Sequence, residues 1–293
     1  MRLNPFDTDN IDVRSSKGGR FPGGGAGQLG CGTLIIAGIV SLLFGTDFGQ
    51  TVAVIDTVNQ TTGSGQVSTA DGQMSEQELC SSSEYATEAC NALQSLNATW
   101  QPEFERANIA FQQPFLHLYS GGVNTRGCGS ATSAAGPFYC PRDGGIYIDT
   151  SFYDTMQQQL GARGDFARLY VVAHEYGHHI QNLTGLADQV ASAQQRDPQN
   201  ANRLQVRMEL QADCYAGVWA GKNKDRIEPG DFEEGMRAAA AIGDDAISER
   251  MGGRVSPESF THGTSEQRMQ ALRLGMNSGN DTICDRYFAP ESF

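Results

Sequence analysis

The pattern of apolar and polar positions predicts a mostly helical protein. Along several segments apolar residues recur at steps of three and four, the spacing of one face of an α-helix. One such segment begins at Asp165. Its apolar stripe consists of Phe166, Leu169, Ala173 and Ile180. Helices are expected over residues 76–96, 101–118, 165–184, 201–220, 231–242 and 265–274.

One short segment has the character of a β-strand. Residues 145–149 (Gly-Ile-Tyr-Ile-Asp) have β-branched and aromatic residues at their centre, and they follow the turn-forming sequence Arg142-Asp143-Gly144. The strand is either an exposed edge, on which an extended peptide can add, or an ordinary internal strand. Helices with a few strands between them predict an α+β domain, which we place at residues 75–293.

The first 74 residues follow a different pattern. Residues 1–28 are polar and glycine-rich, and we expect them to be a disordered cytoplasmic tail. Residues 29–45 carry no charge, so residues 29–46 are predicted to form one transmembrane helix. This is the short end of the range of ~17 to 25 residues that a span requires. Residues 47–74, rich in Thr, Gly, Ser and Gln, are expected to be a flexible tether.

The distribution of basic residues predicts the orientation of this anchor. Lys and Arg precede the apolar run, whereas residues 46–105 contain neither. The positive-inside rule then places the N-terminus in the cytoplasm and the domain on the other side of the membrane. A cleaved signal peptide is the main alternative, although no small-x-small cleavage site follows the run. A buried core helix is a second alternative.

The overall charge argues against one class of partner. The chain of 293 residues has a net charge of −13. Proteins that bind nucleic acid through phosphate contacts need clustered Lys and Arg. We therefore expect no nucleic-acid partner.

The cysteines indicate an oxidising compartment. Six of the seven follow the predicted anchor, namely Cys80, Cys90, Cys128, Cys140, Cys214 and Cys284. An even set beyond a membrane segment is typical of disulfides, and six buried free thiols are the alternative. Local spacing favours Cys80 with Cys90 and Cys128 with Cys140, leaving Cys214 and Cys284 as a long-range pair.

The strongest chemical signal lies in the helix predicted at 165–184. His174 and His178 are four residues apart, so both imidazoles project from one face, one turn apart. That separation lets two ring nitrogens bind one Zn²⁺ at about 2.0 to 2.1 Å. Glu175 can reach a water at the metal without being a ligand, which is the H-E-x-x-H arrangement of metallopeptidases. Zn²⁺ is therefore the expected cofactor.

Two neighbouring residues in this helix carry further information. Gly177 costs about 1 kcal/mol relative to alanine in a helix interior, so we expect another backbone or a substrate to approach closely there. His179 points about 100° away from His178, and we expect it to support the site from behind or to face solvent.

The remaining ligand is expected from another helix, because a catalytic zinc site has three protein ligands and one open position. Glu209 and Asp213 lie four residues apart in the helix predicted at 201–220. Glu209 is the candidate ligand. Asp213 is expected to accept the outer N–H of a ligand histidine and fix its orientation.

These motifs resemble the bacterial putative neutral zinc metallopeptidase family. The resemblance covers roughly residues 75–288 as well as the apolar segment, and it rests on residues 136–141, 146–149, 172–179, 209–214 and 260–268. The chain also resembles the gluzincin pattern of H-E-x-x-H followed by E-x-x-x-D, with an H-x₅-R element as in a group of membrane-anchored peptidases. Gly263 departs from that group, which usually has proline there.

The resemblance implies a zincin-like, gluzincin fold in which His174, His178 and Glu209 bind zinc and Glu175 is the general base. It also implies a single-pass protein of the bacterial inner membrane, with its catalytic domain on the periplasmic, extracytoplasmic side.

A donor for the developing oxyanion is also required. His262 is the candidate, since it precedes a helix that Thr264 and Gln267 can cap; a histidine of the capping region or the surface is the alternative. The rivals for this role are tyrosines, namely Tyr147, Tyr176 and Tyr215. Arg268 is expected either to pair with a carboxylate near the site or to form a structural ion pair.

The sequence therefore predicts a membrane-anchored zinc metallopeptidase that hydrolyses peptide bonds in peptide or protein substrates. Two alternatives are retained. One is a zinc-binding, membrane-tethered scaffold without turnover, and the other is a zinc hydrolase that acts on a non-protein amide.

Overall fold

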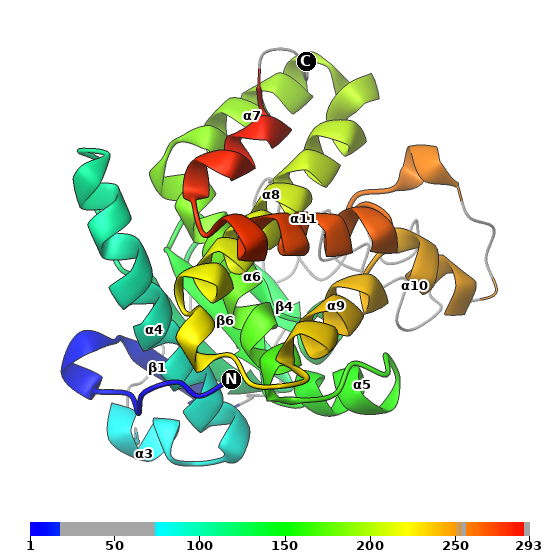
Figure 1. Cartoon of the computed structure of the whole chain (residues 1–293). Helices are drawn as coiled ribbons and strands as arrows, with labels where there is room; N and C mark the ends of the chain where they lie inside the picture. Colours follow the sequence, from blue (N-terminus) through cyan, green and yellow to red (C-terminus); the bar gives the residue numbers. More distant parts are fainter. Residues whose placement is uncertain (18–73, 251, 253–255, 290–293) are drawn as a thin grey trace, which may run out of the picture.

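The computed structural model describes residues 1–17, 74–250, 252 and 256–289. Within these residues a small sheet lies on one side of a group of helices (Figure 1). The helices are α3 (Glu76–Cys80), α4 (Glu84–Arg106), α5 (Phe152–Gln158), α6 (Asp165–Leu183), α7 (Leu186–Arg196), α8 (Ala201–Lys222), α9 (Asp231–Ala241), α10 (Asp244–Arg250) and α11 (Ser265–Ser278). The strands are β1 (Val13–Lys17), β2 (Phe115–Ser120), β3 (Gly122–Asn124), β4 (Ser130–Thr132), β5 (Phe138–Cys140) and β6 (Gly145–Asp149). This arrangement is the predicted α+β class.

The main sheet has the strand order β1-β2-β6-β5. β1, β2 and β6 are parallel, and β5 runs antiparallel to β6. Because side chains alternate along a strand, Leu116 and Ile146 face the helices on one side. Tyr119 and Tyr147 face the other side, where the β3–β4 hairpin covers them with a second apolar cluster. Both faces of the sheet are therefore buried.

The strand predicted at 145–149 is confirmed as β6, but its position decides between the two alternatives given for it. All five of its residues are buried, and it pairs with β2 on one side and β5 on the other. The expectation of an exposed edge at 146–149 is therefore wrong. The outer edge on this side of the sheet belongs to β5.

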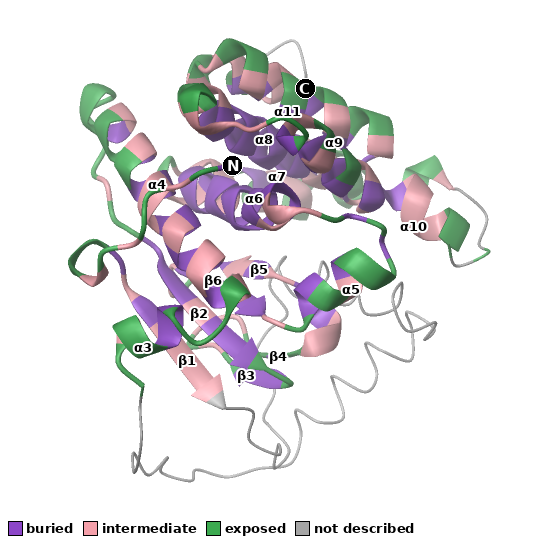
Figure 2. Ribbon diagram, turned by 60° about the horizontal axis from the view of Figure 1, so that its bottom comes forward, coloured by how far each residue is buried: buried purple, intermediate pink, exposed green. Residues whose placement is uncertain are grey.

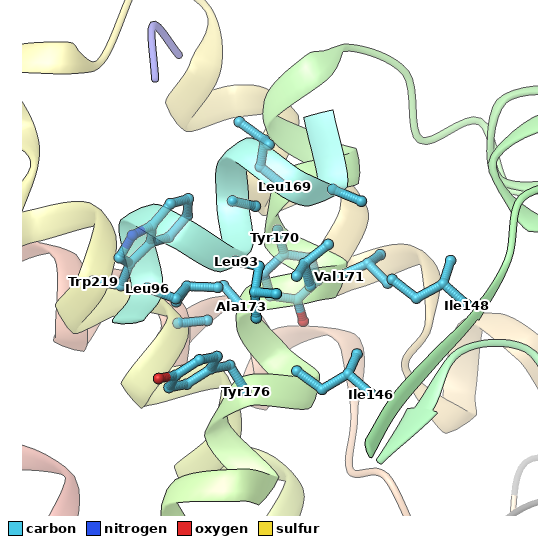
Figure 3. Close-up of a cluster of buried hydrophobic side chains, with 14 of the residues drawn as sticks. Leu93, Leu96, Ile146, Ile148, Leu169, Tyr170, Val171, Ala173, Tyr176 and Trp219 are labelled. Carbon is cyan, nitrogen blue, oxygen red and sulfur yellow. The ribbon is translucent and has the colours of Figure 1, made fainter. Parts of the chain in front are cut away.

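Helix α6 lies between the sheet and helices α8, α9 and α11 (Figure 2). Its side chains meet apolar groups from several directions (Figure 3). Ile146 and Ile148 come from β6, Leu93 and Leu96 from α4, and Trp219 from α8. A helix buried on almost every side is held rigidly by packing, which suits a helix that carries a metal site.

Two glycines allow α8 and α11 to pack in backbone contact. A Cβ atom at Gly217 would lie 2.1 Å from the carbonyl oxygen of Leu272, and one at Gly275 would lie 2.0 Å from that of Cys214. Any side chain at either position would force the helices apart. This contact fixes where α11 places Arg268 relative to α8.

Two of the predicted helices differ from the helices and strands in the structure. The expected helix at 76–96 is two helices, α3 and α4, separated by a short turn after Cys80. The expected helix at 101–118 is wrong, because α4 ends at Arg106 and residues 115–120 form β2. Apolar residues lie on both faces of β2, with Leu116 and Leu118 in one cluster and Phe115 and Tyr119 in the other, so the segment lacks the alternation that marks a strand.

Three disulfides link the cysteines in the pairing that local spacing favours. They join Cys80 to Cys90, Cys128 to Cys140 and Cys214 to Cys284. The last of these ties α8 to the C-terminal 3₁₀ segment Asp281–Tyr287. Its cysteine on α8, Cys214, directly follows Asp213.

The expectation of a disordered tail is wrong for residues 1–17. These residues fold with the domain: Val13 is 4% exposed, its amide donates to Glu76 of α3, and β1 pairs along its length with β2. Alternating apolar residues, Ile11 and Val13, are sufficient for this because β2 offers an open edge. The rest of the predicted tail, the anchor at 29–46 and the tether as far as residue 73 lie outside the described residues.

The pairing of β1 with β2 bears on the predicted anchor. None of the helices that the structure describes is both long enough and apolar enough to span a membrane. β1 precedes the predicted span and α3 follows it, yet Val13 and Glu76 are in contact. A single crossing would place these two residues on opposite sides of a membrane. The single-pass arrangement with a cytoplasmic tail is therefore incompatible with the β1–β2 pair.

Candidate metal centre and active site

The H-E-x-x-H helix is held directly against the helix that carries the expected additional ligand. A Cβ atom at Gly177 would lie 2.8 Å from both the Cα atom and the carbonyl oxygen of Ala212. The close backbone approach expected at Gly177 is therefore present, and its partner is α8. Ala212 is three residues after Glu209, so this contact brings the carboxylate of Glu209 alongside the two histidines.

Three side chains converge where α6 faces α8. The Nε2 atom of His174 lies 3.2 Å from one oxygen of Glu209, and the Nε2 atom of His178 lies 3.6 Å from the other. The candidate ligand atoms all lie within 4.8 Å of one another. In a tetrahedral zinc site, two ligands at about 2.1 Å from the metal are about 3.4 Å apart. The spacing and the donor types, two imidazoles and one carboxylate, therefore fit Zn²⁺.

Electrostatics at this triad favour a bound cation. Burial works against charge on all three groups, but their mutual attraction outweighs it. The two histidines hold the pKa of Glu209 well below its usual range. Burial lowers the pKa of His174, but the charge of Asp213 and hydrogen bonds to Asp213 and Glu209 raise it to about 10. Glu209 likewise raises the pKa of His178 against the effect of burial. The carboxylates of Glu209 and Asp213 thus make the site electrostatically favourable for positive charge.

Glu175 differs from the triad in having no bound partner. It is 8% exposed, and no other described residue forms a hydrogen bond with its carboxylate. Burial raises its pKa, and the nearby imidazoles of His174 and His178 offset this in part. A buried carboxylate with a raised pKa and open lone pairs is suited to accept a proton from a water beside it.

The outer nitrogen of His174 is held by a buried ion pair. Asp213, which is fully buried, accepts hydrogen bonds at 2.8 Å from Nδ1 of His174 and at 2.5 Å from the hydroxyl of Tyr170. Arg268 donates to the same carboxylate from Nε at 2.8 Å and from Nη2 at 2.9 Å. The contact expected between Asp213 and a ligand histidine is present, and Arg268 pairs with a carboxylate near the site. Both interactions direct Nε2 of His174 toward Glu209.

The other candidate ligand, His178, is oriented by Gln181, a residue that the sequence analysis did not predict to be part of the site. Nδ1 of His178 lies 2.9 Å from Oε1 of Gln181, one turn further along α6. The amide nitrogen of Gln181 donates to the carbonyl of Met208 and to Gln211, both on α8. The i, i+3 spacing of His178 and Gln181 was visible in the sequence as a possible contact. Tyr170 lacked such a signal, because its partner lies on another helix.

His179 supports the sheet, not the ligands. Its side chain is 2% exposed, with Nδ1 at 3.0 Å from the hydroxyl of Tyr139 and Nε2 donating at 2.7 Å to the carbonyl of Gln112. Asn182 also donates to Tyr139, at 3.0 Å. Because Tyr139 lies in the middle of β5, these contacts fix the edge strand to the metal-binding helix.

The three tyrosines that were alternative candidates for the oxyanion donor make contacts away from the site. Tyr147 donates to Asp143 on the face of the sheet covered by β3 and β4, and Tyr176 donates to Asn97 of α4. Tyr215 packs edge-on against Trp100 in the core. His262 is the remaining candidate donor. It is 5% exposed and lies in the loop before α11, whose Thr264 and Gln267 form the expected capping box.

A second group of carboxylates lies away from this site. Asp165, Asp231 and Glu234 also approach within metal-binding distance of one another. Here the ammonium group of Met1 already lies 2.8 Å from Asp165 and 2.9 Å from Asp231. The positive charge at this cluster is thus supplied by the chain itself.

The fold and the site together define a candidate metal centre, in which an H-E-x-x-H helix faces a glutamate from a neighbouring helix. Over residues 3–287 the chain matches the sequence profile described as "Putative neutral zinc metallopeptidase". The protein belongs to this family.

Relatives extend over most of the chain. The uncharacterized protein YpfJ of Escherichia coli K12 is 42% identical over 294 residues, covering 96% of each chain. The uncharacterized protein Rv2575 of Mycobacterium tuberculosis is 42% identical over 210 residues, covering 67% of this chain and 69% of the relative. No solved structure matches the chain.

Proposed function

We propose that this protein is a zinc-dependent metallopeptidase in which His174, His178 and Glu209 hold the metal and Glu175 acts as the general base. The observation that carries the proposal is the convergence of the three ligand atoms beside a carboxylate that has no hydrogen-bond partner among the described residues. A site kept only for structure would gain nothing from burying an unpaired carboxylate at this position.

The chemistry assigned to the chain is proton transfer and orientation. Zinc held by the triad would lower the pKa of a bound water and polarise the scissile carbonyl. Glu175 takes one proton from the attacking water and delivers it to the nitrogen of the leaving amine. The water oxygen bonds to the carbonyl carbon, the C–N bond breaks, and no other reactant is consumed. Asp213 and Gln181 keep the two imidazoles in the orientation that this requires.

The proposed docking strand for an extended peptide is β5. Among the described strands none pairs with its outer edge, and β6 is enclosed. Tyr139 ties β5 to α6 through His179, so a peptide added to this edge would be held at a fixed position relative to the metal ligands. The disulfide between Cys128 and Cys140 closes the loop at the end of β5 and would stiffen it.

The test is a Glu175→Gln variant of the full chain, compared with wild type for zinc content and for hydrolysis of a panel of peptides. Glu233→Gln, at an exposed position on α9, is the matched control. We expect Glu175→Gln to retain one zinc per chain and lose turnover, while the control keeps both. Equal turnover in the two variants would favour a scaffold. Cleavage of a peptidoglycan amide but of no peptide would favour the other hydrolase.

The three disulfides support a location in an oxidising compartment, outside the bacterial cytoplasm. We retain membrane attachment through residues 29–46 as part of the proposal, in a form that keeps residues 1–17 and 75–289 on one side of the membrane.

A further inference from the structure

The loop that carries His262 is clasped by a single carboxylate, that of Asp244. One of its oxygens accepts hydrogen bonds from three successive backbone N–H groups, at 2.8 Å from Thr261, 2.6 Å from His262 and 2.9 Å from Gly263. In return, the amide of Asp244 donates to the carbonyl of Gly263 at 2.9 Å. Asp244 is the first residue of α10 and is 6% exposed. The loop is thus fixed to the start of a helix, out of contact with most of the solvent.

This clasp explains why position 263 departs from the proline usual in the group of membrane-anchored peptidases that the sequence resembles. Gly263 has a φ angle of +86°, which is in the left-handed region. Proline is restricted to a φ near −65° and has no N–H to donate. The hydrogen bond to Asp244 therefore excludes proline at position 263, and the positive φ angle favours glycine there.

The second oxygen of Asp244 determines where the proton of the imidazole lies. It is 3.0 Å from Nδ1 of His262. Because a carboxylate that already accepts three N–H groups acts as an acceptor, Nδ1 is the nitrogen that carries hydrogen. The Nε2 atom is left as a lone pair. It is buried and has no hydrogen-bond partner among the residues that the structure describes.

An unpaired buried ring nitrogen needs a reason, because a buried polar group without a hydrogen-bond partner destabilises the fold. The position of the loop supplies one. A Cβ atom at Gly263 would lie 3.2 Å from the side chain of Val206 and 3.5 Å from that of Leu210, which lie on α8 three residues before and one residue after Glu209. Six residues after His262, Arg268 contacts Asp213 on the same face of α8. The loop and the first turn of α11 therefore pack against the part of α8 that carries Glu209.

We propose that Asp244 is a positioning residue, which holds His262 with Nδ1 protonated and Nε2 directed to the reacting carbonyl of the substrate. This inference rests on the proposed peptidase function and deepens it. When Nε2 also carries a proton, it donates a hydrogen bond to the carbonyl oxygen as negative charge develops there. The carboxylate of Asp244 stabilises the charged ring from the far side, and a charged donor makes the stronger hydrogen bond.

Asp244→Asn separates this role from that of a loop clasp. The amide oxygen can still accept the three backbone N–H groups, but the amide nitrogen then faces Nδ1. A donor at that place moves the ring hydrogen to Nε2 and removes the negative charge. Asp245→Asn is the matched control, because Asp245 accepts hydrogen bonds from Ser265, in the same loop region, and has no bond to His262.

The first experiment is a double-mutant cycle on the zinc-loaded full chain. We expect His262→Ala to lower kcat by about 10² to 10³ and Asp244→Asn to lower it by about tenfold, both with KM and zinc content near wild type. Asp245→Asn should stay within about twofold of wild type. Asp244→Asn added to His262→Ala should cause no further loss. Additive effects, or equal effects of the two Asn variants, would overturn the proposal.

The second experiment does not depend on activity. The ¹⁵N shifts of the ring nitrogens, in histidine-labelled full chain, distinguish a protonated nitrogen from a lone pair, and His262→Ala identifies the signals among the five histidines. We expect hydrogen on Nδ1 in wild type and on Nε2 in Asp244→Asn. Hydrogen on Nε2 in wild type would overturn the positioning role. If instead the zinc-loaded wild type cleaves no peptide, the peptidase function fails while this measurement still decides the role of Asp244.

Discussion

Gly177 of α6 and Ala212 of α8 lie in backbone contact, and this contact sets the distance from His174 and His178 to Glu209. Gly177 directly precedes His178, and Ala212 lies about one turn after Glu209. A change of a few tenths of an ångström here would be passed to the triad directly.

Gly177→Ala should therefore destabilise the protein, although alanine in a helix interior is normally favoured by about 1 kcal/mol. The added methyl group overlaps Ala212, so α6 and α8 must separate. We expect a lower melting temperature and at least about tenfold weaker zinc binding, measured by thermal unfolding and by competition with a chromophoric chelator. A higher melting temperature with unchanged zinc affinity would show that the contact does not position the ligands.

Asp213→Asn should weaken zinc binding by about 10- to 100-fold, because His174 loses the carboxylate that orients it. Arg268→Met tests the other half of the ion pair. It leaves the charge of Asp213 buried without its main partner, and we expect it to cost about 3–5 kcal/mol in the free energy of unfolding. Competition with a chromophoric chelator measures the zinc affinity of Asp213→Asn, and urea denaturation measures the free energy of unfolding of Arg268→Met. If Arg268→Met unfolded at the wild-type midpoint, the buried pair would not be structural.

Zinc affinity should rise with pH. The pKa of His174 is raised to about 10, so in the metal-free protein this ring is protonated at neutral pH and must lose the proton when zinc binds. Each released proton gives about tenfold higher affinity per pH unit, and the rise should level off near the raised pKa. Because Asp213 holds this pKa high, the Asp213→Asn variant should level off at lower pH. A pH-independent affinity would contradict the shift.

The same shift sets the stability of the metal-free protein. A raised pKa contributes stability that is fully present below the unfolded value of 6.5 and is lost as the pH rises toward 10. The melting temperature of the protein measured with a chelator present should therefore fall as the pH rises through this range. The melting temperature of the zinc-loaded protein should not show this fall.

Removing the disulfide beside β5 should affect substrate before metal. Cys128→Ser/Cys140→Ser loosens the loop at the end of the edge strand but touches none of the ligands. We expect KM to rise severalfold with zinc content unchanged, measured on any peptide that wild type cleaves. Equal loss of zinc and of substrate binding would count against docking on β5.

Residues 1–17 should prove to be part of the domain. Val13→Asp places a charge at a position that is 4% exposed and should lower the melting temperature by about 5 °C or more. Asp9→Ala, at an exposed position of the same segment, is the control and should have little effect. Identical melting temperatures for wild type and both variants would restore the interpretation of this segment as a tail.

Local patterns predicted the parts of the fold that depend on neighbours in sequence. The helix around His174 was visible because its apolar period and its ligand spacing both repeat within one helix. Thr264 and Gln267 signalled a helix start because a capping box spans only three residues. The three disulfide pairs followed from spacing in two cases and from elimination in the third.

The remainder depended on contacts between distant segments. The sequence of β2 does not show the alternation of apolar and polar residues that predicts a strand. Leu116 and Leu118 are buried on one face and Phe115 and Tyr119 on the other, so neither face is polar. Asp244 carried no signal, because its partner His262 is 18 residues away and the clasp uses backbone N–H groups that any sequence has. β1 was missed because an edge strand needs few apolar residues.

The parallel pairing of β1 also affects how the protein folds. Val13 lies opposite Leu116, so the strand that is synthesised first waits for a partner roughly 100 residues later. The disulfide between Cys128 and Cys140 and the β3–β4 hairpin need only short loops and can form early. Closing the sheet with β1 is therefore expected among the slow steps, and until it closes the edge of β2 remains open to pairing with another chain.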